Sequence, residues 1–282
     1  MRTLIGGLAI SVGIDLLLLL LIYLFQRQFL YFPDPIVPTD QALGQMDVAA
    51  VDISSRPEGR VRSLWWAARH AESPVFLFLH GNAGSHYHRI PIYQALAKDG
   101  AGVLGVGYPG FGGNAGIASE SALFENAQDN YDWLMAQDVA PDRIVIIGES
   151  LGSGVATHLA SQNDAAGLIL IAAYTGMDDL AQRQFPIFPA RYLVKDRYRS
   201  IDRIDRIGMP LAWIHGKRDQ LIPFAMGQRL FDAANVPKSA HAVEQGGHND
   251  LWIRGLGEII LDESQKMTRA AAATANHPIT QR

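Results

Sequence analysis

The pentapeptide Gly-Glu-Ser-Leu-Gly at residues 148–152 constrains the fold of this chain more than any other segment. It directly follows an apolar run at 144–147, and small residues suited to one face of a helix come after it. The glycines two residues either side of Ser150 allow a sharp turn from strand to helix, because no Cβ atom obstructs it. The helix N–H groups then point to where negative charge would develop in catalysis. The segment therefore predicts a nucleophilic serine held at a turn.

Length, charge and cysteine content limit what can surround this turn. With 282 residues and 48% hydrophobic content the chain can bury one sizeable core, so we expect one globular domain. The formal net charge of −4 argues against nucleic-acid binding, since such proteins usually carry a basic face. The absence of cysteine excludes a thiolate nucleophile and a cysteine-ligated metal. We expect neither a metal nor a cofactor.

Strand patterns alternate with helix patterns through most of the chain. Strands are expected at residues 48–53, 62–68, 75–79, 103–106, 144–147, 168–172, 211–214 and 241–244, and helices at 91–98, 119–137, 224–234 and 250–262. This alternation predicts an α/β fold in which helices cover both faces of a mainly parallel central sheet. Because chemistry gathers at the carboxyl ends of such strands, the candidate residues should share one rim of the sheet.

The N-terminal segment is predicted to be a single transmembrane helix outside this domain. Residues 4–25 are apolar, with leucine at every position from 16 to 21, and as a helix they would reach about 33 Å, enough to cross a bilayer. A cleaved signal peptide is the alternative, but no small-residue cleavage site follows. Arg2 and the terminal amine slightly outweigh Arg27, which predicts a cytoplasmic N-terminus and an extracytoplasmic globular domain.

These patterns divide the chain into four parts. We expect a membrane anchor at residues 1–28, an aromatic and proline-rich linker at 29–44, the globular domain at 45–266 and a flexible tail at 267–282. An irregular insert at about 175–208 is expected to form a small cap over the rim. Part of this insert is apolar, with basic residues interspersed, which suits a cleft for an acyl chain with a polar or anionic head. A cap that simply packs on its own sheet explains the same composition equally well.

Ser150 needs a base, and that base needs an orienting acid. In hydrolases with this turn, the acid and then the histidine follow the nucleophile in the chain. His248 fits this order, because it lies in a glycine-containing loop after the last expected strand. Asp219 follows the strand at 211–214 and is the preferred acid. The remaining alternatives for the acid are Asp178, Asp179 and Asp250.

A tetrahedral intermediate also needs N–H donors for its oxyanion. One donor should be the amide of Leu151, the residue after the nucleophile. The other should be the amide of Asn82, in the loop that follows the strand at 75–79. His80, in the same loop, is expected to be a buried spacer that bonds to its own loop.

Two further patterns are set aside. Residues 105–110 spell the glycine motif of dinucleotide sites, but Pro109 and more glycines delay any helix, so no nucleotide is expected. His86 and His88 could suggest a metal site, but no third ligand lies nearby in the sequence. These two histidines are expected on the surface.

Taken together, the motifs resemble the α/β-hydrolase superfamily. The resemblance is greatest to its single-pass, membrane-anchored serine hydrolases, which include depalmitoylase-like and serine aminopeptidase-like relatives. The matching segments are residues 26–35, 80–84, 108–112, 148–152, 215–219 and 247–248. Pro109 stands where many relatives have arginine, so any role of that arginine does not transfer.

The resemblance implies a triad of Ser150, His248 and Asp219, with an oxyanion hole at Asn82 and Leu151. Relatives cleave carboxylic esters, thioesters or, in some branches, peptides. We therefore predict a serine hydrolase that forms an acyl-enzyme from a small or lipid-like acyl substrate. A serine peptidase of the same fold and a non-catalytic, membrane-anchored binding protein are the alternatives. The intact triad set favours an enzyme, since a scaffold has no need of all three residues.

Overall fold

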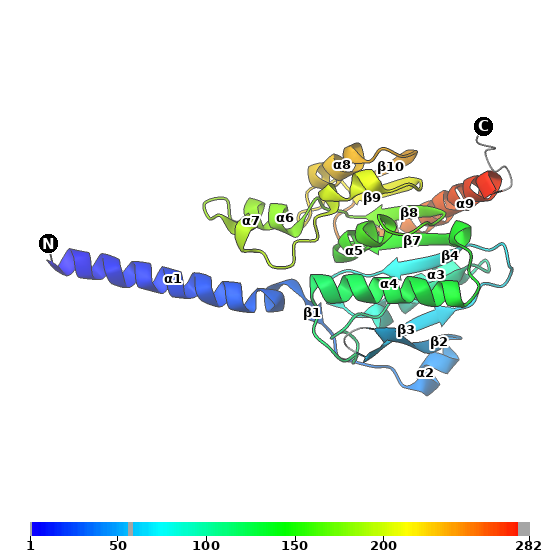
Figure 1. Cartoon of the computed structure of the whole chain (residues 1–282), viewed down its shortest axis with the longest axis horizontal. Helices are drawn as coiled ribbons and strands as arrows, with labels where there is room; N and C mark the ends of the chain where they lie inside the picture. The colour runs from blue at the N-terminus through cyan, green and yellow to red at the C-terminus, as the bar shows by residue number, and fades with distance from the viewer. Residues whose placement is uncertain (1, 56–58, 276–282) are drawn as a thin grey trace.

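The computed structural model describes the backbone of residues 2–55 and 59–275, and the side chains of these residues except 2–12, 15, 16 and 275. Eight strands of this part form a central sheet in the order β10-β9-β8-β7-β4-β6-β3-β2 (Figure 1). Strand β3 pairs antiparallel with β2 and β6, whereas the other neighbours pair in parallel. The mainly parallel sheet predicted from the sequence is confirmed. Its strands are β2 (Ala49–Ser55), β3 (Gly59–Trp66), β4 (Val75–Leu79), β6 (Gly102–Gly105), β7 (Ile144–Glu149), β8 (Gly167–Ile171), β9 (Leu211–Gly216) and β10 (Lys238–Val243).

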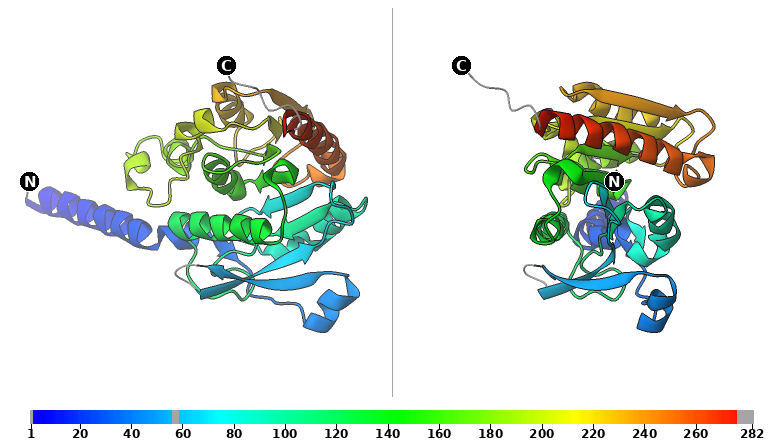
Figure 2. Two further views of the ribbon diagram at one scale, coloured as in Figure 1. Left: turned by 45° about the vertical axis from the view of Figure 1, so that its right-hand side comes forward. Right: turned by 90° about the vertical axis from the view of Figure 1, so that its right-hand side faces the viewer.

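Helices cover both faces of the sheet (Figure 2). One face carries α4 (Glu120–Ala136), α5 (Leu151–Ala160) and α8 (Phe224–Ala233), and the other carries α3 (Ile90–Ala97) and α9 (Leu256–Ala275). Successive strand residues point to opposite faces. In β4, Leu77 and Leu79 therefore join the first core while Phe76 and Phe78 join the second. Short 3-10 turns complete the domain: η1 (His86–Arg89), η2 (Pro141–Arg143), η3 (Ser200–Asp202), η4 (Ile204–Arg206) and η5 (Trp252–Arg254).

The predicted linker packs directly on the globular domain. After α1 (Arg2–Leu30), strand β1 (Phe32–Pro33) pairs in parallel with β5 (Ala83–Gly84), and α2 (Asp40–Gln45) follows, capped by Thr39. The amide of Phe32 donates to the carbonyl of Asn82 at 2.9 Å. This pairing has no local sequence signal, because it joins two short segments about fifty residues apart along the chain. The segment after α1 thus braces a loop that the sequence places in the oxyanion hole.

Helix α1 projects away from the domain (Figure 1). The predicted membrane span at residues 4–25 lies partly outside the residues whose side chains are described. Within the described residues, no helix combines the length and the apolar character needed to cross a membrane. The transmembrane helix expected from the sequence is therefore not found in this structure.

The insert between β8 and β9 contains α6 (Met177–Gln184) and α7 (Ala190–Leu193) and lies on the same side of the domain as α1 (Figures 1 and 2). At the other end of the chain, α9 continues nine residues beyond the domain end expected at 266. Met267 is buried there beneath the sheet, so its packing extends the helix. The rest of the predicted tail, residues 276–282, lies outside the described residues.

Candidate active site

Ser150 lies at the turn between β7 and α5, with φ at +52° and ψ at −117°. A residue other than glycine in such a conformation costs on the order of 1–3 kcal/mol, which the surrounding structure must offset. The Ser150 amide is held by the carbonyl of Ile171 at 2.9 Å. A Cβ atom at Gly152 would overlap the Leu79 carbonyl oxygen, and one at Gly148 would lie 2.6 Å from the Gly152 carbonyl oxygen. The two glycines are thus needed for close packing around the turn.

His248 connects the serine to an acid. Its Nε2 atom lies 3.0 Å from Ser150 Oγ, and its Nδ1 atom lies 2.7 Å from Asp219 Oδ2. A neutral ring that donates from Nδ1 to the carboxylate leaves Nε2 free to accept the serine proton. The loop of His248 is held by the Gly247 amide, which donates to Asp250 Oδ1 at 2.6 Å. The three residues singled out in the sequence therefore meet in one hydrogen-bonded chain.

The Asp219 carboxylate is buried and well supplied with hydrogen-bond donors. Its Oδ1 atom accepts from the amides of Leu221 at 2.9 Å and Ile222 at 2.8 Å. Burial alone would raise the pKa of Asp219, but hydrogen bonds from His215, His248 and the Ile222 amide lower it overall. The carboxylate is therefore charged at neutral pH, and it can orient the imidazole and stabilise it when protonated.

His215 is a site residue to which the sequence analysis assigned no role. It is fully buried, and its Nδ1 atom accepts from the indole Nε1 of Trp213 at 3.2 Å. Its Nε2 atom must then carry the proton, which it donates to the Ile222 carbonyl at 2.9 Å, with Asp219 Oδ2 at 3.4 Å. His215 thus supports the acid from behind. Its position four residues before Asp219, at the end of an apolar strand, is a signal that could have suggested this role.

The three alternative acids are engaged elsewhere. Asp178 pairs with Arg199 at 2.8 Å, and Asp179 accepts from the Thr175 hydroxyl at 2.8 Å. Asp250 accepts from the Gly247 amide and pairs with Arg254 at 2.7 Å. Among the four candidates, Asp219 is the one whose carboxylate contacts His248 in the described part of the chain.

The loop at 80–84 lies against the nucleophile. A Cβ atom built on Gly81 would be 3.5 Å from Ser150 Cβ, so the neighbouring Asn82 is close to the serine. The Asn82 side chain donates to the Leu30 carbonyl at 2.8 Å, which fixes the loop from the end of α1. Leu151 is the first residue of α5, where the N–H group has no carbonyl partner within the helix. Leu151 therefore adjoins Ser150 and the loop of Asn82 lies against it, while the role of the two amides as oxyanion donors stays a prediction.

The histidines of this loop and of η1, which follows it, have different surroundings. His80 is fully buried and its Nδ1 donates to the Gly81 carbonyl at 2.8 Å, which confirms it as a buried spacer. The prediction that His86 lies on the surface is wrong, because its ring is fully buried and packs on Tyr87 at 4.0 Å. Burial lowers the pKa of His86 to about 3, with a smaller contribution from Arg62. His88 is partly exposed, and its Nε2 lies 3.3 Å from Asp34.

An ion pair also flanks the serine. Glu149, the residue before the nucleophile, accepts from Arg89 Nε at 2.9 Å and from the Trp252 indole at 3.4 Å. These contacts tie η1 and η5 to the end of β7. No local pattern indicates this pair, because its partners are 60 residues apart along the chain.

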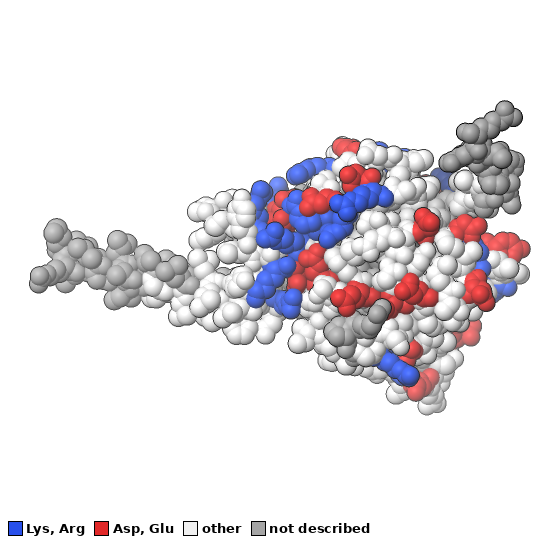
Figure 3. Space-filling view, viewed as in Figure 1, with Lys and Arg blue, Asp and Glu red and all other residues white. Residues whose placement is uncertain are grey.

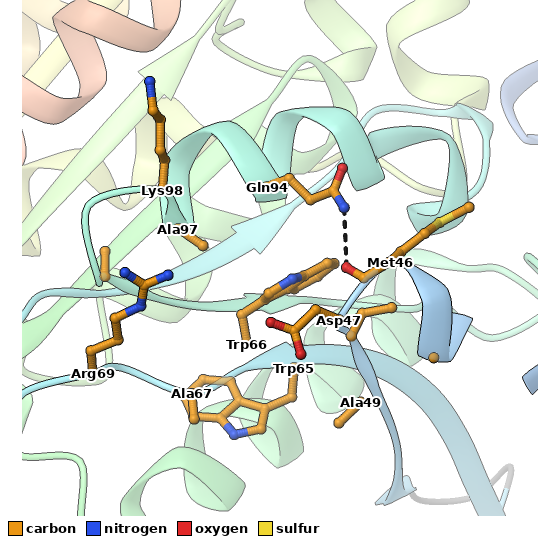
Figure 4. A pocket seen from close by; sticks show the side chains of 13 residues that line it. Met46, Asp47, Ala49, Trp65, Trp66, Ala67, Arg69, Gln94, Ala97 and Lys98 are labelled. Carbon is orange, nitrogen blue, oxygen red and sulfur yellow. Dashed lines mark hydrogen bonds between the residues drawn. The ribbon is translucent and has the colours of Figure 1, made fainter. Parts of the chain in front are cut away.

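A broad cavity of about 660 Å³ opens elsewhere on the domain (Figure 4). Trp65, Trp66 and the end of α3 form much of its wall, and Gln94 donates to the Met46 carbonyl across it at 3.1 Å. None of its lining residues belongs to the hydrogen-bonded chain of Ser150, His248 and Asp219. The cavity is therefore separate from the candidate active site.

Comparisons with known proteins agree with this geometry. A family model described as the alpha/beta hydrolase fold matches residues 74–194. The uncharacterized protein Rv2307c of Mycobacterium tuberculosis is 34% identical over 253 residues, which cover 88% of this chain and 88% of that protein. The lysophosphatidylserine lipase ABHD12 of Danio rerio is 31% identical over 204 residues, covering 64% of this chain and 53% of that protein.

Solved structures show the same fold. An esterase of Pyrococcus furiosus, PF2001, superimposes with a TM-score of 0.66 at 18% identity, covering 86% of this chain and 98% of that chain. The chain belongs to the alpha/beta hydrolase superfamily and is a hydrolase. The narrower resemblance to its membrane-anchored members stays a prediction.

Proposed function

We propose that the chain is a serine hydrolase that cleaves a carboxylic ester or thioester through an acyl-enzyme on Ser150. The observation that carries this proposal is the hydrogen-bonded chain from Asp219 through His248 to Ser150, with distances of 2.7 and 3.0 Å. These distances suit proton transfer from the hydroxyl to the imidazole without rearrangement. The strained turn and the adjacent helix N-terminus support the same assignment.

In the first half of the reaction, Ser150 Oγ attacks the acyl carbonyl carbon while its proton passes to His248 Nε2. The oxyanion that forms accepts hydrogen bonds from the amides of Leu151 and Asn82. The imidazolium is stabilised by the Asp219 carboxylate at Nδ1. When the intermediate collapses, the bond to the alcohol or thiol breaks, and that leaving group takes the proton from Nε2.

The second half releases the acid. A water molecule gives a proton to His248 Nε2 and attacks the acyl carbon bound to Ser150. A second tetrahedral intermediate forms at the same amides, and its collapse returns the proton to Ser150 Oγ. Free carboxylic acid leaves and the enzyme is regenerated, with every proton passing through one nitrogen.

For the substrate, we propose a single acyl chain attached to a polar or anionic head. Two observations support this choice. Several relatives are named lysophosphatidylserine lipases, and one of them is 31% identical to this chain. The cap insert also combines exposed apolar residues with exposed Arg183, Arg191 and Lys195, which suits a lipid with an anionic head.

A labelling experiment tests the nucleophile. The full chain should react with a fluorophosphonate probe, and Ser150→Ala should abolish the labelling because the attacking oxygen is gone. Ser153→Ala is a matched control, since Ser153 is also buried on α5 but lies outside the hydrogen-bonded chain. Equal labelling of wild type and Ser150→Ala would contradict the proposal and favour a different nucleophile or a non-catalytic protein.

A substrate series tests the acyl class. The kcat/KM for p-nitrophenyl esters should rise as the acyl chain lengthens beyond butyrate, and lysophospholipids should be hydrolysed at a Ser150-dependent rate. A rate that is flat or falls with chain length would contradict the lipid-like substrate while leaving the serine hydrolase intact. Hydrolysis of peptide amides in preference to esters would favour the peptidase alternative.

We also propose that α1 attaches the enzyme to a membrane, with the hydrolase domain on the extracytoplasmic side. Most of the apolar side chains described on α1 are exposed around the helix, which supports contact with lipid. The exposed ones include Ile14, Leu17, Leu18, Leu20, Leu21, Ile22, Leu24, Phe25 and Phe29. The full chain should partition into the membrane fraction after a high-salt wash, and protease added to spheroplasts should digest the domain. A domain protected from protease would reverse the orientation.

A further inference from the structure

We propose that the tip of the cap insert is a docking surface for an anionic lipid membrane. The tip comprises Phe185, Ile187, Phe188, Tyr192 and Leu193, all of which are exposed. Ile187 is 91% exposed, an unusual position for an aliphatic side chain. A single exposed apolar residue is ordinary in a folded protein. A cluster of exposed apolar side chains is unfavourable in water and therefore marks an interaction surface.

The tip is continuous with the end of α1. Gln26 donates to the Leu193 carbonyl at 3.1 Å and accepts from the Lys195 amide at 2.7 Å. The Lys195 ammonium lies 4.3 Å from the centre of the Tyr23 ring. Below these contacts, Arg27 forms an ion pair with the buried Asp196 at 2.8 Å. The cap and the exposed apolar stretch of α1 therefore belong to one surface on the same side of the domain (Figures 1 and 2).

Positive charge borders this surface. Between residues 183 and 199 the basic side chains are Arg183, Arg191, Lys195, Arg197 and Arg199, against Asp196 as the acid of the same stretch. Arg199 pairs with Asp178 and Asp202, and Arg191 lies 3.7 Å from Asp179. Within the described residues, the cations of this stretch that form no ion pair are Arg183, Lys195 and Arg197. In the space-filling view, basic side chains gather between an uncharged region and the rest of the domain, with some acidic side chains among them (Figure 3). The whole chain carries a formal net charge of −4, so this local excess opposes the overall balance.

An apolar tip bordered by a basic band fits a lipid surface better than a second protein. The apolar side chains can enter the boundary between headgroups and acyl chains, while arginine and lysine remain at the level of the phosphates. Anionic lipids attract each such cation, and the attraction adds over the band. Docking at this surface would hold the cap insert against the membrane, where single-chain lipids reside. The inference concerns attachment and stands whether or not the proposed reaction is correct.

The absence of cysteine allows a direct test. The Ile187→Cys variant of the full chain is labelled with an environment-sensitive NBD dye and reconstituted into vesicles. One set of vesicles is pure phosphatidylcholine, and the other contains about 30% phosphatidylserine, which makes the surface anionic. On the anionic vesicles the dye should shift to the blue and be quenched by lipids with spin-labelled acyl chains. Both changes should be smaller on neutral vesicles.

Met135→Cys is the matched label control. Met135 is 39% exposed and lies near the C-terminal end of α4. The first residue of this helix, Glu120, contacts the cap by accepting a hydrogen bond from the Arg197 amide. Fifteen residues of helix place it about 22 Å from that contact. A dye at this position should report water on both kinds of vesicle. A dye at Ile187→Cys that behaves in the same way on membrane-bound protein would overturn the inference.

Charge reversal tests the basic band. Arg183→Glu should reduce the anionic-lipid response of the Ile187→Cys label by about fivefold or more, since each cation near such a surface contributes about that factor. Arg269→Glu makes the same change in net charge at an exposed position on α9 and should leave the response unchanged. Equal lipid responses of Arg183→Glu and Arg269→Glu would show that the basic side chains beside the tip do not contribute to membrane binding. A blue shift that grows with protein concentration in the absence of lipid would instead assign the tip to a second copy of the chain.

Ester hydrolysis by the same labelled proteins separates this inference from the proposed function. Activity without a lipid response would overturn the docking surface alone. A lipid response without Ser150-dependent hydrolysis would support the docking surface and contradict the proposed reaction.

Discussion

The two halves of the candidate site are held in place in different ways. Ser150, Asp219 and His248 follow three strands of the parallel sheet, and backbone groups from the same rim support them. The loop of Asn82 also follows a central strand, but it is braced from outside the sheet by Leu30 and by the pairing of β1 with β5. The triad side is thus fixed by the domain, whereas the oxyanion side depends on the segment that follows α1.

This difference has a consequence for how each half should respond to change. A substitution in the triad removes a group that transfers or stabilises a proton, so its effect should be chemical and large. A substitution in the brace leaves all reacting groups in place and changes only how precisely the loop is positioned. The two halves can therefore be told apart by the size of the effect and by whether stability changes with it.

The largest effect is expected for Ser150→Ala. Loss of the attacking oxygen should lower kcat by about 10⁶-fold on any ester that the wild type hydrolyses. The free energy of unfolding should change little, because the variant keeps the same backbone turn and loses only the hydroxyl group. Steady-state kinetics with p-nitrophenyl esters measure the first quantity. Ser153→Ala, on the same helix, should retain activity within a small factor, and a loss in this control equal to that of Ser150→Ala would mean that the helix itself had been disturbed.

The next effect is expected for Asp219→Asn. The amide should favour the wrong tautomer of His248, so kcat should fall by about 10⁴-fold while KM changes little. Asp250→Asn provides the comparison, because Asp250 holds the loop through the Gly247 amide rather than contacting the imidazole. Its effect should be clearly smaller. If Asp250→Asn proved the more damaging substitution, the assignment of the orienting acid would be wrong.

Acid should destabilise the oxyanion side through His86. Burial lowers the pKa of His86 to about 3, so the folded state holds this ring neutral where the unfolded chain protonates it. Keeping this ring neutral costs the folded state nothing above the unfolded pKa of about 6.5. As the pH falls from there toward about 3, the free energy of unfolding decreases by up to about 1.4 kcal/mol per pH unit. His86→Phe should flatten the pH dependence of the free energy of unfolding by this amount.

Urea denaturation in detergent at a series of pH values between about 4 and 7 measures this slope. His70→Phe is the control, because His70 is exposed on a surface turn and its replacement should leave the slope unchanged. An unaltered slope in His86→Phe would show that this ring contributes nothing to the acid sensitivity of the fold.

The smallest effect is expected for Asn82→Ala. This variant keeps the backbone amide proposed for the oxyanion hole but loses the bond from the side chain to the Leu30 carbonyl. One hydrogen bond contributes about 0.5–1.5 kcal/mol, so kcat should fall by roughly tenfold or less, with KM unchanged. Kinetics on a soluble ester give the comparison. A loss as large as that of Asp219→Asn would mean that the brace determines the site as strongly as the triad does.

Much of the sheet and of the triad follows from local pattern. Apolar runs identified the strands to within a few residues, and Ser150 was marked by its glycines. Glycine is required beside that turn by a close approach of backbone atoms, which is why the pattern is informative. The order of acid and histidine along the chain then favoured His248 as the base and Asp219 as the acid, while Asp178, Asp179 and Asp250 stayed open as alternatives.

Other features could not be predicted because their partners are distant in sequence. The bond of Asn82 to Leu30 and the pairing of Glu149 with Arg89 leave no periodic pattern in either segment. His86 was expected on the surface because a polar side chain usually stays in water. Its burial depends on the aromatic ring of Tyr87 packing over it, which only the folded chain provides.

The sequence by itself determined the strand-to-helix turn at Ser150, the alternation that builds a parallel sheet, and the identity of the three residues that meet at its rim. These features depend on neighbours along the chain and on the order of the elements. The tertiary structure decided that His215 lies against Asp219, that the end of α1 and the segment after it brace the loop of Asn82, and that the cap presents its apolar residues to the outside. Each of these requires surfaces from separate elements to meet, and that contact is determined by packing in three dimensions.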